Sequence, residues 1–151
     1  EFAKRNNAVA STDVKSFEHL VCTEQLSRRL GFKVGEELIR VVRVRSLNGN
    51  ARQVDHGYFL ASIAKGLTPE IAADSIYGYL EHKRGVKVMA SRRTVSVELA
   101  NDEDCSYLDL GKYNCVAVME SQSYTSDGIL FEVTHTRTHP EIFHYRVNSK
   151  R

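Results

Sequence analysis

Hydrophobic and polar residues alternate most clearly along residues 38–47, whose sequence is LIRVVRVRSL. β-Branched residues favour strands, and the Asn-Gly pair that follows is a strong signal for a tight hairpin turn. Because side chains alternate between the two faces of a strand, Arg43 and Arg45 share one face with three aliphatic side chains. A face with that aliphatic content is at least partly buried, and a buried arginine requires an anionic partner.

The same patterns predict helices and strands along the rest of the chain. Thr23 is a suitable N-cap for a short helix that ends at Gly31, and Asn101 caps another over residues 101–108. A third helix, capped by Asp74 or Ser75, covers about residues 74–83, and residues 61–71 form a loop or short helical turn. Residues 1–7 resemble the end of a helix. Strands are predicted at residues 12–21, 38–47, 52–60, 86–99, 115–124, 129–138 and 143–147.

Most consecutive strands are joined by short turns, which makes them antiparallel neighbours. The fold class is therefore α+β, with a mostly antiparallel sheet and flanking helices. The 151 residues contain two prolines and no evident linker, so residues 1–151 are expected to form a single domain.

The register of the hairpin after residue 47 decides where Asp55 lies. A two-residue loop would pair Leu47 with Asn50 and place Asp55 on the face opposite Arg43. A three-residue loop with a bulge at Gly49 would place Asp55 on the same face as Arg43. The residues themselves leave both registers open.

Composition narrows the class of protein. With 42% hydrophobic and 26% charged residues the chain has a globular composition, and a net charge of +2 does not argue for a nucleic-acid surface. Neither a membrane-spanning apolar run nor a signal-peptide pattern is present. The three cysteines lack Cys-x-x-Cys spacing, which fits core thiols in a reducing cytoplasm.

Candidate chemistry centres on anion binding. Arg43 and Arg45 either bind an external anion or form an internal salt bridge with Asp55 or Glu132. Ser75, at a predicted helix start, is either a simple N-cap or part of an anion site. Glu132 lies on a polar strand face, which is either part of the site or simply exposed to solvent.

Other catalytic and metal-binding signals are weak. His135, His139 and His144 lack helical spacing and a completing carboxylate or cysteine cluster, so no metal or other cofactor is expected. The sequence contains no nucleophile elbow, Walker loop or dinucleotide-binding glycine motif. Cys22 near His19 is too generic a pair to indicate a nucleophile.

Several motifs in order resemble UTRA domains, the effector-binding halves of HutC-type regulators in the GntR family. Arg-Val-Arg at 43–45, Ser-Leu-Asn-Gly at 46–49 and Asp55 resemble the family's central hairpin. Residues 74–80 (DSIYGYL) resemble its Ser-Leu-Tyr-x-x-Leu helix start. Residues 126–132 (SDGILFE) and Arg137 resemble its late hairpin, with Leu130 in place of the usual proline.

The resemblance implies a chorismate-lyase-like fold and a cytoplasmic, bacterial, homodimeric transcription regulator that acts as a repressor, rather than an enzyme. A winged helix-turn-helix that binds operator DNA would normally precede this domain and is absent from this chain. A Ser-Phe pair that contributes to the site in sugar-phosphate-binding members would fall before Glu1, leaving one edge of the pocket incomplete.

Carried over to this sequence, the resemblance assigns a ligand site. Arg43 and Arg45 would pair with the anionic end of an effector, a phosphorylated sugar being preferred. Ser75 and the backbone N–H groups of Ile76 and Tyr77 would complete the anion cradle. Asp55, where the family usually has glutamate, and Glu132 would bind hydroxyls or an amine, and Arg137 completes the set. This assignment favours the register that places Asp55 beside Arg43.

Two alternatives belong to other functional classes. One is a lyase that acts on an aromatic carboxylate, which rests on fold analogy alone. The other is a dimerisation module that binds no ligand and satisfies its arginines internally, through an Arg43–Asp55 pair.

Overall fold

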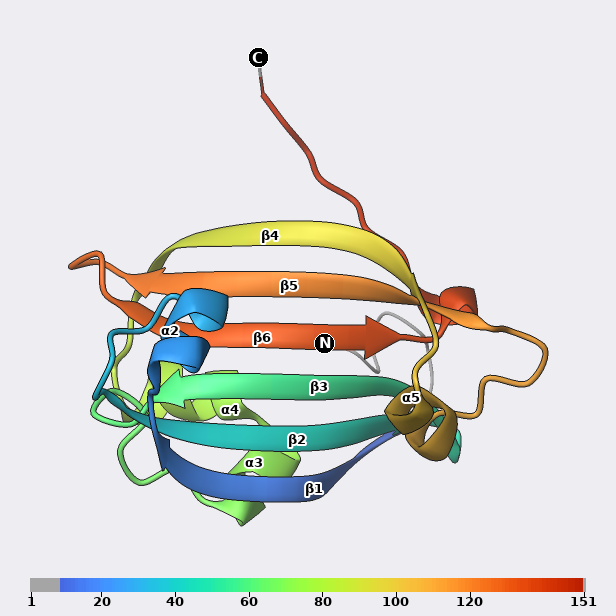
Figure 1. The fold of residues 1–151 in the computed structure, drawn as a ribbon, viewed down its shortest axis with the longest axis horizontal. Helices are drawn as coiled ribbons and strands as arrows, with labels where there is room; N and C mark the ends of the chain where they lie inside the picture. The colour runs from blue at the N-terminus through green and yellow to red at the C-terminus, as the bar shows by residue number, and fades with distance from the viewer. Residues whose placement is uncertain (1–8, 151) are drawn as a thin grey trace.

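The computed structural model describes residues 9–150, which form one six-stranded sheet with short helices on both faces (Figure 1). The strand order is β1-β2-β3-β6-β5-β4, and every neighbouring pair is antiparallel. The strands are β1 (Ala10–Val21), β2 (Glu37–Leu47), β3 (Asn50–Leu60), β4 (Val88–Leu99), β5 (Cys115–Thr125) and β6 (Leu130–Thr138). The predicted α+β class and antiparallel sheet are therefore confirmed.

The helices are short, and their caps are largely those that the sequence indicated. They are α2 (Glu24–Leu30), α3 (Pro69–Asp74), α4 (Ile76–Gly78), the π-helical turn η1 (Tyr79–Lys83), α5 (Asp102–Tyr107) and the 3₁₀ turn η2 (Pro140–Ile142). Thr23 and Asn101 accept hydrogen bonds from backbone N–H groups in the first turns of α2 and α5. The helix end predicted at residues 1–7 lies outside the described residues.

The two faces of the sheet carry different helices. Figure 1 shows α2 and α5 in front of the sheet and α3 and α4 behind it. We call the front the α2–α5 face; it carries His56, Tyr58, His135 and Arg137. We call the back the α3–α4 face; it carries Arg43, Asp55 and Glu132. Adjacent residues such as Asp55 and His56 face opposite sides because strand side chains alternate.

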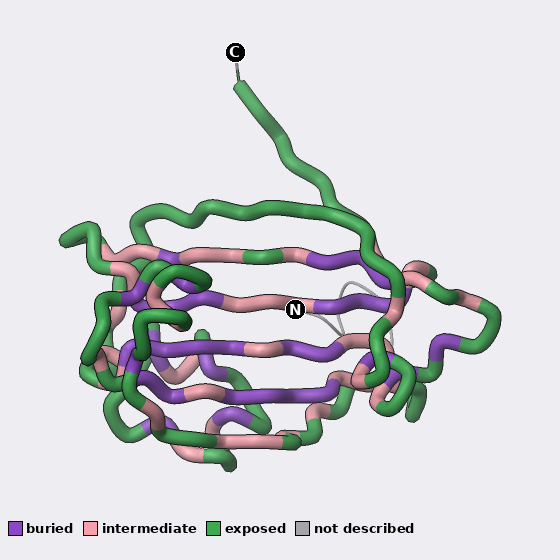
Figure 2. The backbone as a smooth tube through the Cα atoms, in the orientation of Figure 1, coloured by how far each residue is buried: buried purple, intermediate pink, exposed green. Residues whose placement is uncertain are grey.

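Strands β2 and β3 are mostly buried, whereas the middle of β5 and β6 is only partly buried (Figure 2). Two hydrophobic clusters account for the buried parts. One cluster joins β2, β3 and β6 to the helices and includes the fully buried Phe32, Phe59 and Phe131. A second packs Val54, Val116 and Val118 against Leu108 and Leu110, which follow α5. These two clusters fix the helices over the sheet and so position the polar groups described below.

The β2–β3 hairpin matches neither predicted register completely. Asn48 and Gly49 both have positive φ, and the two-residue turn pairs Leu47 with Asn50. The register then shifts by one residue, so that Arg45 pairs with Gln53 and leaves Arg52 as a bulge. Arg43 consequently lies directly opposite Asp55, on the same face.

Three local predictions are corrected. Residues 143–147 are not a strand, because the chain beyond η2 runs away from the sheet and pairs with neither edge strand, β1 or β4 (Figure 1). Residues 61–71, predicted as a loop or short helical turn, end in a helix that runs beyond them, since α3 begins at Pro69 with Thr68 as its cap and continues to Asp74. Cys22 is a buried core thiol as expected, but Cys105 is exposed.

Candidate functional site

Arg43 and Arg45 meet a single carboxylate on the α3–α4 face. Arg43 Nη2 lies 3.2 Å from Asp55 Oδ2, and Arg45 Nε lies 3.0 Å from the same oxygen. Gln53 donates its side-chain amide to the other oxygen of Asp55 at 2.7 Å. Arg43 also donates to the backbone carbonyl of Ala72 in α3 at 3.1 Å. The arginine pair is thus tied to both the sheet and the helix behind it.

This cluster is buried, so its charges are poorly solvated by water. Arg43 and Asp55 are only 9% and 6% exposed, respectively. Burial lowers the pKa of Arg43, and the charge of Asp55 opposes that shift. Two guanidinium groups share the carboxylate of Asp55, and Glu132 lies close enough to act electrostatically on Arg43. An anion of suitable size would be attracted to such a surface.

A second polar group on the same face links α4 to the sheet. Tyr77 donates its hydroxyl to Glu132 at 2.5 Å, and that hydroxyl lies 3.2 Å from Ser123 Oγ. Glu132 is 3% exposed, and burial raises its pKa, against the effect of the Tyr77 and Ser123 hydrogen bonds and the nearby charge of Arg43. Burial, reinforced by Glu132, also raises the pKa of Tyr77. The tyrosine therefore stays protonated and continues to donate.

The predicted helix start lies beside these groups. Ser75 is the N-cap of α4, and its hydroxyl accepts a hydrogen bond from Gly78 N at 3.0 Å. Ile76 is buried, at 3% exposed, whereas Tyr77 is 42% exposed. The contact between Arg43 and Ala72 reaches the backbone three residues before Ser75. Ser75 also lines an open cavity of about 510 Å³ formed by α3, α4 and η1.

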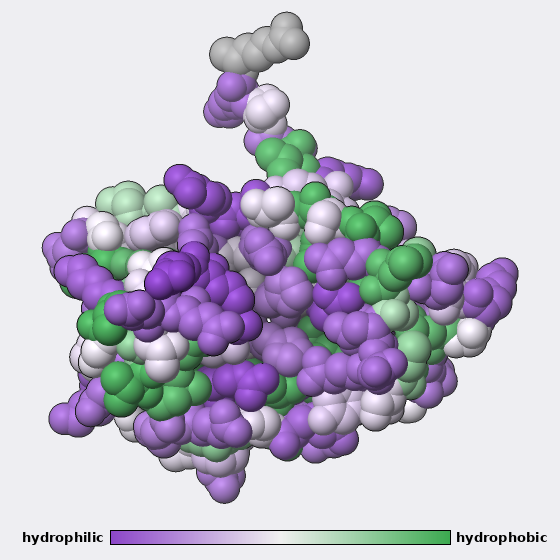
Figure 3. Space-filling model, in the orientation of Figure 1, coloured by the Kyte–Doolittle hydropathy of each residue, from purple (hydrophilic) through white to green (hydrophobic). Residues whose placement is uncertain are grey.

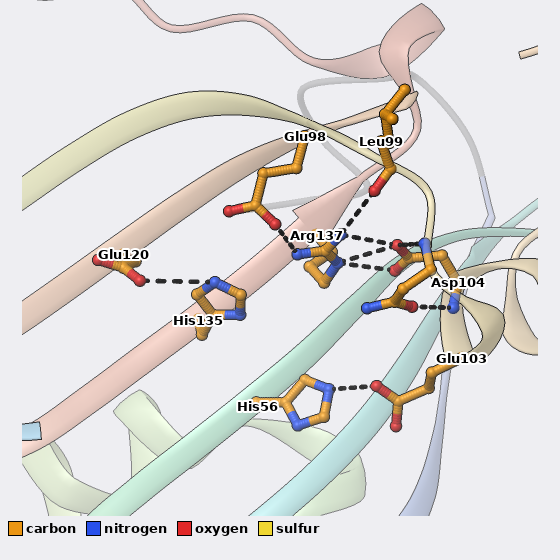
Figure 4. Close-up of polar contacts among 9 residues, drawn as sticks. His56, Glu98, Leu99, Glu103, Asp104, Glu120, His135 and Arg137 are labelled. Carbon is orange, nitrogen blue, oxygen red and sulfur yellow. Dashed lines mark hydrogen bonds and ion pairs between the residues drawn. The ribbon is translucent and has the colours of Figure 1, made fainter. Parts of the chain in front are cut away.

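Arg137 does not join this group, because it lies on the α2–α5 face. Its guanidinium contacts both oxygens of Asp104 in α5, with the shortest distances at 2.8 Å, and Glu98 in β4 at 2.5 Å (Figure 4). Arg137 is 4% exposed and Asp104 is 0% exposed. These carboxylates raise the pKa of Arg137. Arg137 therefore anchors α5 to the sheet through internal ion pairs.

Sequence reasoning missed three parts of the α3–α4 face. It assigned Tyr77 only a backbone N–H, whereas the side chain crosses to Glu132. It did not select Ser123, which is 1% exposed, or Gln53, which orients Asp55. Alternation along β5 could have placed Ser123 on the Glu132 face, but only the register between β5 and β6 pairs the two residues.

The histidines considered as metal ligands are dispersed. His135 lies beside Glu120 on the α2–α5 face, while His139 is buried against the Tyr113 ring. His144 is exposed. Within residues 9–150 the structure contains no group of three or more His, Cys, Asp or Glu side chains arranged to hold a metal ion.

Comparison with known proteins identifies the class and then the family. Solved structures with this fold include the effector-binding domain of the Bacillus subtilis trehalose repressor TreR, with a TM-score of 0.85 and 27% identity. That match covers 93% of this chain and 98% of the TreR domain. The effector domain of PhnF from Mycobacterium smegmatis shares the fold at 17% identity, with a TM-score of 0.83 and coverage of 99% and 92%. The fold is thus that of regulator effector domains, and residues 5–144 match the UTRA domain. The chain belongs to the UTRA domain family.

The curated relatives are transcriptional regulators rather than enzymes. TreR of B. subtilis is 27% identical over 145 residues, which cover 96% of this chain. The uncharacterised regulator YydK of B. subtilis is 31% identical over 88 residues, or 58% of this chain. The chain spans 61% of the length of TreR and 37% of that of YydK. These matches favour a regulatory domain over the lyase alternative.

Proposed function

We propose that this domain senses a small anionic metabolite, specifically a phosphorylated sugar, for a transcription regulator of the GntR family and HutC subfamily. The effector would bind on the α3–α4 face. It would change how an attached winged helix-turn-helix, the part that contacts operator DNA, engages its site. The regulator would act as a repressor in the bacterial cytoplasm. Within the described residues no helix is long and apolar enough to cross a membrane.

The observation that carries the proposal is the sharing of Asp55 by Arg43 and Arg45 beneath the α3–α4 junction. Arginine cannot lose its proton under physiological conditions, so both guanidinium groups remain cationic on this face. A phosphate is a dianion that accepts several hydrogen bonds, and paired guanidinium groups suit it. Backbone N–H groups near Ser75 would add donors to the same anion.

Asp55 and Glu132 would hold the neutral part of the effector. Both carboxylates are buried and already accept hydrogen bonds from protein donors, namely Gln53 and Tyr77. Sugar hydroxyls could replace or supplement those donors without leaving a buried oxygen unsatisfied. The Asp55 side chain is one methylene shorter than that of Glu132, so it reaches less far toward a ligand.

The proposed mechanism is a population shift. An effector that binds one arrangement of a homodimer more tightly moves the population toward it, and this changes the spacing of the DNA-binding modules. The size of the shift is limited by the difference between the effector's affinities for the two arrangements.

Strand β4 offers a surface for the second copy in that homodimer. It is an edge strand along which every residue is exposed (Figure 2). Val95, Val97 and Leu99 lie on one face of it and are 41%, 72% and 75% exposed, respectively. An exposed apolar edge of this length invites pairing with another chain. Val97→Glu should therefore shift the domain from dimer to monomer in light scattering, whereas Val34→Glu, at an exposed turn away from β4, should not.

The ligand-free dimerisation module remains the second candidate, because Arg43 and Asp55 do form an internal ion pair. Calorimetric titration separates the two. The domain should bind a sugar phosphate more tightly than its unphosphorylated parent. Equal affinity for the two would refute the phosphate specificity, and no binding of either across a panel would favour the ligand-free module.

Arg43→Ala provides the matching mutational test. Because it removes one partner of a buried charge pair, it should weaken sugar-phosphate binding by about 2–5 kcal/mol. Arg28→Ala removes the same charge from an exposed position on α2, where Arg28 pairs with the exposed Glu24, and should leave binding unchanged.

A further inference from the structure

A polar cavity of about 450 Å³ lies on the α2–α5 face, on the side of the sheet opposite Arg43. Helix α2 contributes Arg29 and Leu30 to one end, and the start of α5 contributes Asn101 and Glu103 to the other. Figure 3 shows hydrophilic side chains gathered around a hollow at the centre of this face. The volume falls within the range of small-molecule sites, but such sites are usually more apolar. The lining therefore favours a polar ligand.

The sheet forms the floor of this cavity in successive rows that run across the strands. In the row nearest α2, Arg40 of β2 and Arg92 of β4 lie at the two ends, with Tyr58 between them. In the next row toward α5, His56, His135 and Glu120 lie side by side. Residues two apart on a strand are separated by about 7 Å, so the rows are separated by that distance.

The row nearest α2 is cationic. Arg29 donates to the Tyr58 hydroxyl at 2.7 Å, and the Arg29 and Arg40 guanidinium groups lie 5.6 and 5.9 Å from the Tyr58 ring centre. Arg40 lies 3.4 Å from Glu18, which does not line the cavity. Arg92 is exposed, and within residues 9–150 the structure records no ion pair for it. Three arginines therefore line this end of the cavity, and one of them, Arg40, is paired with a carboxylate outside it.

The end toward α5 is rich in hydrogen-bond acceptors (Figure 4). His56 Nε2 lies 2.8 Å from Glu103, and His135 Nε2 lies 3.6 Å from Glu120. The two imidazole rings contact each other edge to face, with centroids 6.5 Å apart. Arg137 adds little free charge here, because Asp104 and Glu98 neutralise it. This end suits hydrogen-bond donors such as hydroxyl groups and repels a second anionic group.

We propose that this cavity is a second ligand site, which takes a small organic anion whose other end carries hydrogen-bond donors. The anionic group would lie between Arg29 and Arg92, since Arg40 is already paired with Glu18 at the far end of the row, and the donors would reach Glu103 and Glu120. Along the strands the cationic row and the acceptor row are separated by about 7 Å, which a hexose phosphate spans. This site is separate from the one proposed on the α3–α4 face and does not depend on it.

The histidines provide a direct measurement of occupancy. Of the six histidines in the chain, His56 and His135 line the cavity. Titrating the domain with glucose 6-phosphate should move their imidazole ring signals in two-dimensional ¹H–¹⁵N spectra. Inorganic phosphate, which lacks the donors, and glucose, which lacks the anion, should each bind at least about tenfold more weakly, the equivalent of one charge-assisted hydrogen bond. Unchanged His56 and His135 signals at saturating glucose 6-phosphate would overturn the proposal.

Adjacent arginines on β4 supply a matched pair of variants. Arg92→Ala removes a charge from the cavity and should weaken the His56 and His135 response about tenfold. Arg93→Ala removes the same charge from the opposite face and should leave that response unchanged. Equal effects of the two variants would show a general charge effect and overturn the site. Arg43→Ala should retain the response, which keeps this test distinct from that of the α3–α4 face.

Discussion

Replacing Arg137 by methionine tests whether this residue is a structural anchor or a ligand group. The change removes a guanidinium that is 4% exposed and leaves Asp104, at 0% exposed, without its bidentate partner. Breaking a buried pair by removing one partner costs about 3–5 kcal/mol. For a domain of this size each kcal/mol lowers Tm by about 2–4 °C, so the melting temperature should fall by about 6–20 °C.

Urea unfolding provides the free energy, and two further variants make the result interpretable. Arg28→Met breaks an exposed pair whose side chains are 81% and 77% exposed, and should change stability by less than about 0.5 kcal/mol. Adding Asp104→Leu to Arg137→Met removes the stranded charge. The double variant should recover part of the loss, although it also loses the α5 capping box, which contributes about 1 kcal/mol.

A loss below about 1 kcal/mol for Arg137→Met would refute this reasoning, because it would mean that Asp104 does not depend on the guanidinium. Asp104→Leu is measured alone as well, and a double variant that loses as much as Arg137→Met and Asp104→Leu together would also contradict the reasoning. Coupled groups should deviate from additivity.

Two further predictions concern buried titratable groups. Glu132→Gln should increase the free energy of unfolding at neutral pH, because burial raises the Glu132 pKa and its ionised form costs stability there. The gain should vanish below about pH 4, where Glu132 is protonated in both the folded and the unfolded state. Urea unfolding at several pH values checks this. The His135 ring should titrate below 6.5 because burial lowers its pKa, so its contribution to stability is lost as pH falls below that value. Glu120→Gln should lower that pKa further in an NMR titration, and an upward shift would contradict the assigned cause.

Much of the secondary structure could be predicted because its signals are local. The caps Thr23 and Asn101 and the Asn48–Gly49 turn each depend on residues within one turn of the chain. The alternation along β2 correctly placed Arg43 and Arg45 on one face. The prediction failed at residues 143–147, where alternation was present but the chain beyond η2 runs away from the sheet and pairs with neither edge strand.

The candidate site was only partly predictable. The sequence selected Arg43, Asp55 and Glu132, which the structure places on one face, but Arg137 lies on the other. A position on a strand fixes the face of a side chain only when the register is known. The bulge at Arg52 sets that register between β2 and β3, and no residue type in the hairpin specified it.

By itself the sequence determined the fold class, most strands and helix caps, and the presence of two arginines on a half-buried strand face. These follow from residue type, spacing and side-chain alternation, which act over a few residues. Tertiary structure alone decided that both arginines share Asp55, that Tyr77 reaches Glu132, and that α2 and α5 enclose a polar cavity on the other face. Those contacts join residues far apart in the chain, so they depend on how the strands pair and where the helices pack.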